Sequence, residues 1–178
     1  MVKPDADDWR LAAETGTARR DEAEAGGAPK VPSWTPASAG IPAAVLQDLI
    51  DWAREGAPNE ACGLLAATRT AEDGGVPSRF LPMKNEAASP YRYEIDPADL
   101  YRLTVATDDA DEVFWGIVHS HTHTPAVPSP TDLALAFYPD ALYVLVSLSE
   151  AEADQASGAP SLRAWRIVDG EAHEVAVT

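Results

Sequence analysis

One stretch of the sequence places two histidines and an aspartate where they could bind a metal ion. His119 and His121 follow an uncharged run, residues 113–118, which is typical of a strand buried on both faces. Side chains two positions apart on a strand share a face, so both imidazoles are expected to project the same way. Asp132 falls in the first turn of a helix expected after Ser129, where its carboxylate can point back toward the strand end. Two histidines and one carboxylate are a known ligand set of catalytic zinc, with a fourth position left for water.

A zinc site of this kind also needs a base that takes a proton from the water. Glu60 is the candidate, because it follows a Pro-Asn turn and directly precedes the apolar strand expected at residues 62–65. Each part also has a simpler interpretation. A His-x-His pair need not bind metal, Glu60 could be a surface carboxylate, and Ser129 with Asp132 forms a capping box. The capping and metal roles are compatible, since capping would fix where the aspartate points.

The surrounding pattern predicts a single domain in which helices cover a central sheet. Residues 1–38 are rich in Ala, Gly, Pro and charge and lack periodicity, so we expect a disordered tail followed by a domain at 39–178. Helices are expected over residues 42–55, after Asp96-Pro97 and after Ser129-Pro130. Strands are expected at 62–65, 79–84, 91–95, 113–118, 141–148, 161–168 and 171–177. Strands mixed with a few helices indicate an α/β or α+β sandwich.

Composition and charge exclude several classes of partner. The net charge is −16, so the chain lacks the basic footprint that nucleic-acid binding requires and is not expected to bind an anionic membrane. The longest near-apolar run, residues 141–146, is far shorter than the roughly 20 residues of a membrane helix. Cys62 is the single cysteine, and residues 1–10 do not resemble a secretory signal. These features predict a cytoplasmic protein without disulfides.

The stretch from His119 to Asp132 resembles the motif of the JAMM (MPN-plus) metalloproteases. His119, His121, Ser129 and Asp132 fill the motif, and Glu60 matches the upstream catalytic acid of the family. The resemblance implies an α/β fold, an MPN-type (cytidine-deaminase-like) mixed sheet flanked by helices. It also implies one zinc ion held by the two histidines and the aspartate, with Ser129 stabilising the oxyanion.

Within this family the chain looks most like the short bacterial Mec-type enzymes. The resemblance lies in residues 59–65, 89–96, 119–132, 143–147 and 163–170. Such relatives cleave an amino acid or peptide from the Gly-Gly tail of a ubiquitin-like sulfur-carrier protein. The implied reaction releases cysteine and the free carrier. A Gly-Gly tail fits physically, because glycines let an extended backbone pass close to a metal.

His123 departs from the family pattern, because it creates a second His-x-His with His121. The spacing to Asp132 favours His119 and His121 as the ligands, and His123 as a loop or substrate-side residue. Tyr91 and Tyr93 could line a tail-binding groove, although strand packing would explain them equally well. We expect Cys62 to be a buried structural thiol rather than a nucleophile.

Several alternative functions stay open at this point. The chain could be a general deconjugase of ubiquitin-like modifiers, a cell-wall or phage-tail peptidase, or a non-catalytic zinc-binding MPN scaffold. In a fourth alternative, His123 closes the coordination of a purely structural zinc.

Overall fold

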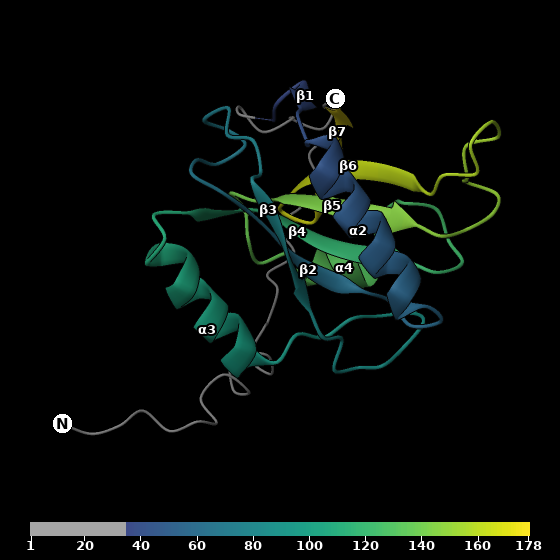
Figure 1. Ribbon diagram of the computed structural model, residues 1–178, viewed down its shortest axis with the longest axis horizontal. Helices are drawn as coiled ribbons and strands as arrows, with labels where there is room; N and C mark the ends of the chain where they lie inside the picture. The colour runs from purple at the N-terminus through teal and green to yellow at the C-terminus, as the bar shows by residue number, and fades with distance from the viewer. Residues whose placement is uncertain (1–34) are drawn as a thin grey trace, which may run out of the picture. The chain divides into compact units, whose positions relative to one another are not determined.

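A seven-stranded mixed sheet forms the centre of the protein (Figure 1). The structure is a computed structural model, and it describes residues 35–178. The strands lie in the order β1-β7-β6-β5-β4-β2-β3. Neighbours are antiparallel except for the parallel pairs β1–β7 and β4–β5. The strands are β1 (Ser38–Ala39), β2 (Cys62–Ala67), β3 (Arg79–Met83), β4 (Val113–His121), β5 (Leu142–Ser147), β6 (Ser161–Val168) and β7 (Glu171–Val177).

Helices cover the two faces of this sheet separately. Helix α2 (Ala43–Gly56) crosses one face, seen in front of the strands in Figure 1, and buries its stripe of Val45, Leu49 and Ala53. Helices α3 (Pro97–Asp108) and α4 (Pro130–Ala134) contribute to the apolar cluster on the other face. Because strand side chains alternate between faces, β2 supplies Leu65 and Ala67 to one cluster and Cys62 and Leu64 to the other.

The two helices on the second face begin at side-chain caps that the sequence predicts. The Asp96 carboxylate accepts hydrogen bonds from the backbone N–H groups of Ala98 and Asp99 at the start of α3. At the start of α4, Ser129 and Asp132 form a complete capping box. Helix α4 has only five residues, so the cap determines its orientation to a large extent.

The sheet differs from the sequence prediction mainly at residues 91–95 and at its first strand. Residues 91–95 form no strand; Asn85 and Glu86 bond to them instead, and the segment runs extended beside the sheet. The placement of His119 and His121 at the end of the buried strand is confirmed, because β4 pairs with β5 up to His121. The first strand begins at Ser38, one residue before the predicted domain start, and pairs with β7. The rest of the predicted tail, residues 1–34, lies outside the described residues.

Candidate metal centre

His119, His121 and Asp132 come together at the carboxyl end of β4. The Nε2 atoms of the two histidines are 3.2 Å apart, and they lie 3.3 and 3.5 Å from the Asp132 carboxylate oxygens. Strand alternation turns both imidazoles toward the face covered by α3 and α4. The N-terminus of α4 brings the carboxylate to the same point. Of the His, Cys, Asp and Glu side chains at residues 35–178, these three form a group that could hold a metal ion.

The spacing of these atoms fits a small tetrahedral ion. Zinc binds imidazole nitrogen and carboxylate oxygen at about 2.0–2.2 Å, so neighbouring ligand atoms of a tetrahedron lie about 3.3–3.5 Å apart. The three distances in the group lie close to that range. When both neutral rings carry their proton on Nδ1, the two Nε2 lone pairs face each other, and a cation between them would satisfy both. The donor set therefore suits a divalent metal ion.

At His119 and Asp132, burial and hydrogen bonding favour the protonation states that bind metal. Burial lowers the pKa of His119 and favours its neutral form. Burial opposes ionisation of Asp132, but the hydrogen bonds from His119 and His121 outweigh it and hold the pKa of this carboxyl well below its usual range. For His121, the bonds to Asp132 and to the Pro125 carbonyl outweigh burial and raise the pKa.

Three hydrogen bonds to consecutive backbone carbonyl groups hold the loop after β4 in place. The Thr124 carbonyl accepts from Ser147 Oγ on β5 at 2.7 Å, and the Pro125 carbonyl lies 2.7 Å from His121 Nδ1 on β4. The Ala126 carbonyl accepts from the Trp165 indole on β6 at 2.9 Å. The middle contact requires a proton on His121 Nδ1, which leaves Nε2 of the neutral ring free as a ligand atom. Three adjacent strands thus fix the loop that joins the histidines to Ser129.

Glu60 lies beside the group in the turn before β2. Its side chain is only 6% exposed, and it lines the same cavity as His121 and Asp132. Its backbone N–H donates to the Ser89 carbonyl, and its carbonyl accepts from the Asn85 side chain. Burial raises the pKa of Glu60 to about 7; His121 lowers it and Asp132 raises it further. A carboxyl with such a pKa can both accept and return a proton near neutral pH.

Ser120 positions Glu60, a role that the sequence reasoning missed. Its hydroxyl accepts the Ala61 N–H at 2.8 Å, and its backbone N–H donates to the Ala61 carbonyl at 2.9 Å. These two bonds fix the residue next to Glu60 against the strand that carries the histidines. The sequence holds a partial signal, because the residue between two same-facing histidines must point to the opposite side of the strand.

The three residues named as substrate contacts occupy different surroundings. Tyr91 and His123 are exposed and line a cavity of about 140 Å³ together with Glu60 and Ser129. Tyr93 instead stacks on His119, with ring centroids 4.7 Å apart. His123 is not part of the metal-binding group. Cys62 is fully buried, as predicted, and burial raises its pKa to about 12, which makes it unreactive.

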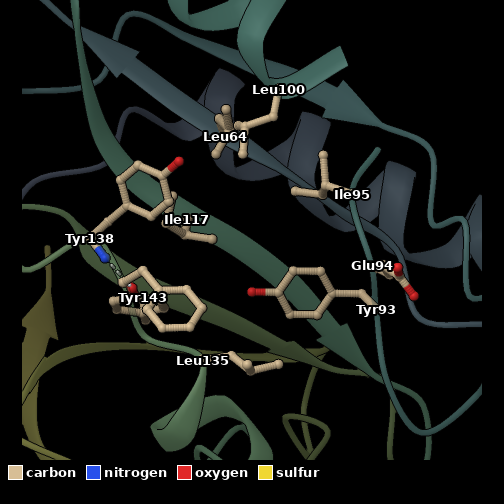
Figure 2. A pocket seen from close by; sticks show the side chains of 10 residues that line it. Leu64, Tyr93, Glu94, Ile95, Leu100, Ile117, Leu135, Tyr138 and Tyr143 are labelled. Carbon is tan, nitrogen blue, oxygen red and sulfur yellow. Dashed lines mark hydrogen bonds between the residues drawn. The ribbon is translucent and has the colours of Figure 1, made fainter. Parts of the chain in front are cut away.

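A second cavity lies on the other side of Tyr93. It measures about 230 Å³ and is mainly apolar, with one wall from residues 93–95 and another from residues 135–138. Figure 2 shows the Tyr93 ring pointing across this cavity toward Tyr143, with Leu135 beside them and Leu64 and Leu100 at the far end. Because Tyr93 stacks on His119, the cavity adjoins the metal-binding group.

Fold and site together define a JAB-type domain with a complete His-His-Asp group. The model of the prokaryotic homologs of the JAB domain matches residues 42–168, and the chain belongs to this family. It is 42% identical over 134 residues to the CysO-cysteine peptidase of Mycobacterium tuberculosis, covering 75% of this chain and 86% of that protein. It is 35% identical over 104 residues to the desampylase of Haloferax volcanii, covering 56% and 73% respectively. A solution structure from Desulfitobacterium hafniense shares the fold with a TM-score of 0.67 and 29% identity, covering 79% of this chain and 91% of that one.

Proposed function

We propose that this protein is a zinc-dependent peptidase or isopeptidase that cleaves the bond after the C-terminal Gly-Gly of a ubiquitin-like sulfur-carrier protein and releases cysteine. The observation that carries the proposal is the convergence of His119, His121 and Asp132 beside the buried carboxyl of Glu60. The similarity to a CysO-cysteine peptidase over 86% of its length supports the choice of substrate.

Zinc held by His119, His121 and Asp132 would supply Lewis acidity toward the attacking water and the scissile carbonyl. Glu60 accepts the proton of that water and later returns it to the nitrogen of the leaving amino acid. Its raised pKa suits this double role, since a base with a pKa near the working pH transfers protons in both directions. Ser120 and Asn85 keep Glu60 in place through their bonds to Ala61 and to the Glu60 carbonyl.

Ser129 contributes a hydrogen bond to the developing oxyanion. Its hydroxyl oxygen accepts the Asp132 N–H at 3.2 Å, and within residues 35–178 the hydroxyl proton has no protein acceptor. That proton is therefore available to a substrate oxygen. The capping box and the catalytic role use different parts of the same hydroxyl group, so Ser129 serves both.

The extended segment at residues 91–95 supports binding of a carrier tail. The Arg92 carbonyl accepts from the Asn85 side chain, the Glu94 N–H donates to that side chain, and the Glu94 carbonyl accepts from the Glu86 N–H. Across the described part of the chain, the backbone N–H and C=O groups of Tyr93 and Ile95 have no hydrogen-bond partner. The free backbone groups of Tyr93 and Ile95 can pair with an extended peptide. The apolar cavity beside it would take side chains that precede the Gly-Gly.

The first experiment follows the intact mass of a sulfur-carrier protein that ends in Gly-Gly-Cys. With zinc, we expect the enzyme to remove one cysteine, and with a chelator we expect no loss. Glu60→Gln should retain zinc and lose about 10²–10⁴-fold in turnover. Asp132→Ala should lose stoichiometric zinc and stay folded. A zinc-loaded protein that leaves the cysteine in place would reject this substrate, and full zinc binding by Asp132→Ala would reject the ligand set.

General deconjugation of ubiquitin-like modifiers is the second candidate function. The similarity to a desampylase and, at 32% identity over 94 residues, to a probable TtuB-conjugate cleaving protease of Thermus thermophilus favours it. Cleavage of a lysine-linked conjugate at a rate equal to that of Gly-Gly-Cys would support it. A structural zinc closed by His123 is disfavoured, because the His123 Nδ1 atom lies 2.6 Å from Thr122 Oγ1 and the residue lies outside the three-residue group.

Cytoplasmic location stays a prediction of the sequence. Among residues 35–178, no helix is long and apolar enough to cross a membrane.

A further inference from the structure

The cavity next to Glu60 is smaller than the apolar cavity beyond Tyr93. It encloses about 140 Å³ and is lined by Glu60, Ser129, Thr124, Tyr91 and His123, besides the metal-binding side chains. This volume includes the space that the proposed zinc ion would take, because two of its ligands line the cavity. The apolar cavity beyond Tyr93 is separate and does not include Glu60.

The position of Glu60 assigns the two cavities to the two sides of the scissile bond. In the proposed reaction Glu60 protonates the leaving nitrogen, so the leaving group must lie within reach of its carboxyl. Glu60 lines the smaller cavity. The leaving group therefore occupies the smaller cavity, and the acyl side of the substrate runs past Tyr93.

Tyr91 and His123 form the outer wall of this leaving-group cavity. Their rings come from separate loops, and the ring centroids are 6.4 Å apart. Thr122 links the two loops: its hydroxyl donates to the Pro90 carbonyl at 3.0 Å and contacts His123 Nδ1 at 2.6 Å. Since the single hydroxyl proton goes to Pro90, the second contact is a bond from His123 Nδ1–H to the Thr122 oxygen. The imidazole is thereby held in one orientation beside Tyr91.

Tyr91 is 81% exposed, so its ring is accessible to a bound substrate. We infer that the Tyr91–His123 wall is a specificity determinant that restricts the leaving group to a single small amino acid and disfavours branched, lysine-linked conjugates. The inference rests on the proposed function and adds to it the residues that select the leaving group. Both rings line the cavity that contains Glu60, so the shape that a leaving group meets there depends on these two side chains.

The test compares kcat/KM for two substrates, a carrier ending in Gly-Gly-Cys and the same carrier joined through Gly-Gly to the lysine side chain of a peptide. We expect the wild-type enzyme to prefer the cysteine conjugate. His123→Ala should lower the ratio of the two kcat/KM values by at least about tenfold, which is the scale of discrimination that pocket shape provides. His123→Phe keeps the bulk of the ring without its hydrogen bond and should largely retain the ratio.

His173→Ala is the matched control, because His173 lies on β7 and outside both cavities. It should leave both rates unchanged, and zinc content is measured for every variant. An unchanged ratio in zinc-loaded His123→Ala would overturn the inference and leave the proposed function intact. Loss of zinc in His123→Ala would also overturn it, since His123 would then serve the metal. Failure of the wild-type enzyme on both substrates would overturn the proposed function and the inference together.

Discussion

Burial of Glu60 lowers the stability of the folded protein by an amount that depends on pH. An ordinary glutamate ionises near pH 4.5, whereas burial raises the pKa of Glu60 in the folded protein to about 7. The unfolded chain therefore releases this proton earlier than the folded chain. As pH rises from 4.5 to 7, folding loses stability through Glu60, and above pH 7 the loss is complete and constant.

We predict that Glu60→Gln makes the metal-free protein more resistant to unfolding at high pH. A neutral amide avoids burial of a charge, so the stability of the variant relative to wild type should increase by about 2 kcal/mol between pH 5 and pH 8. Urea unfolding in the presence of a chelator measures this change. A stability difference that is the same at both pH values would contradict the assigned pKa.

Sequence reasoning predicted that His119, His121 and Asp132 lie together because their geometry is local. His119 and His121 share a face through strand alternation, and the capping box directs Asp132. The stacking of Tyr93 on His119 could not be predicted, because it joins two segments 26 residues apart whose path depends on the whole sheet. The hydrogen bonds between Ser120 and Ala61 could not be predicted either, because they depend on the pairing of β2 with β4.

At the level of elements, the segment at residues 91–95 shows where the sequence pattern was incomplete. Alternation in the sequence predicted a strand, and the structure has an extended segment with no strand partner. Alternation reports that a backbone is extended, but a strand also needs a neighbour with which to pair. No local pattern states whether that neighbour belongs to the same chain.

The loop at residues 124–126 leads to a prediction about metal affinity. Trp165→Phe removes the indole N–H that anchors the Ala126 carbonyl and preserves most of the apolar side chain. We expect zinc to bind about 10-fold more weakly, because outer-shell bonds of this kind orient the ligands. Competition with a chromophoric chelator measures the affinity.

Trp115→Phe provides the matched control for that experiment. Its indole also donates to a carbonyl, that of Gly75, but it packs in the cluster under α2 on the opposite face of the sheet. We expect this variant to lose stability and to keep its zinc affinity. Equal losses of zinc affinity in the two variants would mean that a general loss of stability, rather than loss of the bond to the Ala126 carbonyl, lowers the affinity.

At the scale of the whole molecule, the N-terminal boundary of the domain can be tested by truncation. Strand β1 pairs with β7, and Ile41, 4% exposed, donates its N–H to the Thr178 carbonyl. Removal of residues 1–34 should leave the melting temperature nearly unchanged. Removal of residues 1–41 also deletes β1 and Ile41 and should lower it by roughly 5–10 °C, since burial of one such side chain contributes about 2 kcal/mol.

Thermal unfolding of both truncated forms decides between the two boundaries. A large drop after removal of residues 1–34 would mean that the segment expected to be a tail stabilises the domain. Equal melting temperatures for both forms would mean that β1 contributes little.

The anchoring of the loop at residues 124–126 relies on main-chain oxygen atoms, which every amino acid carries. Substitutions at His123 and Thr124 can therefore occur without loss of these three hydrogen bonds. Natural selection can remodel the cavity wall and leave the metal-binding group undisturbed. In this chain a change of leaving-group preference would therefore not require a change in the residues of the proposed zinc site.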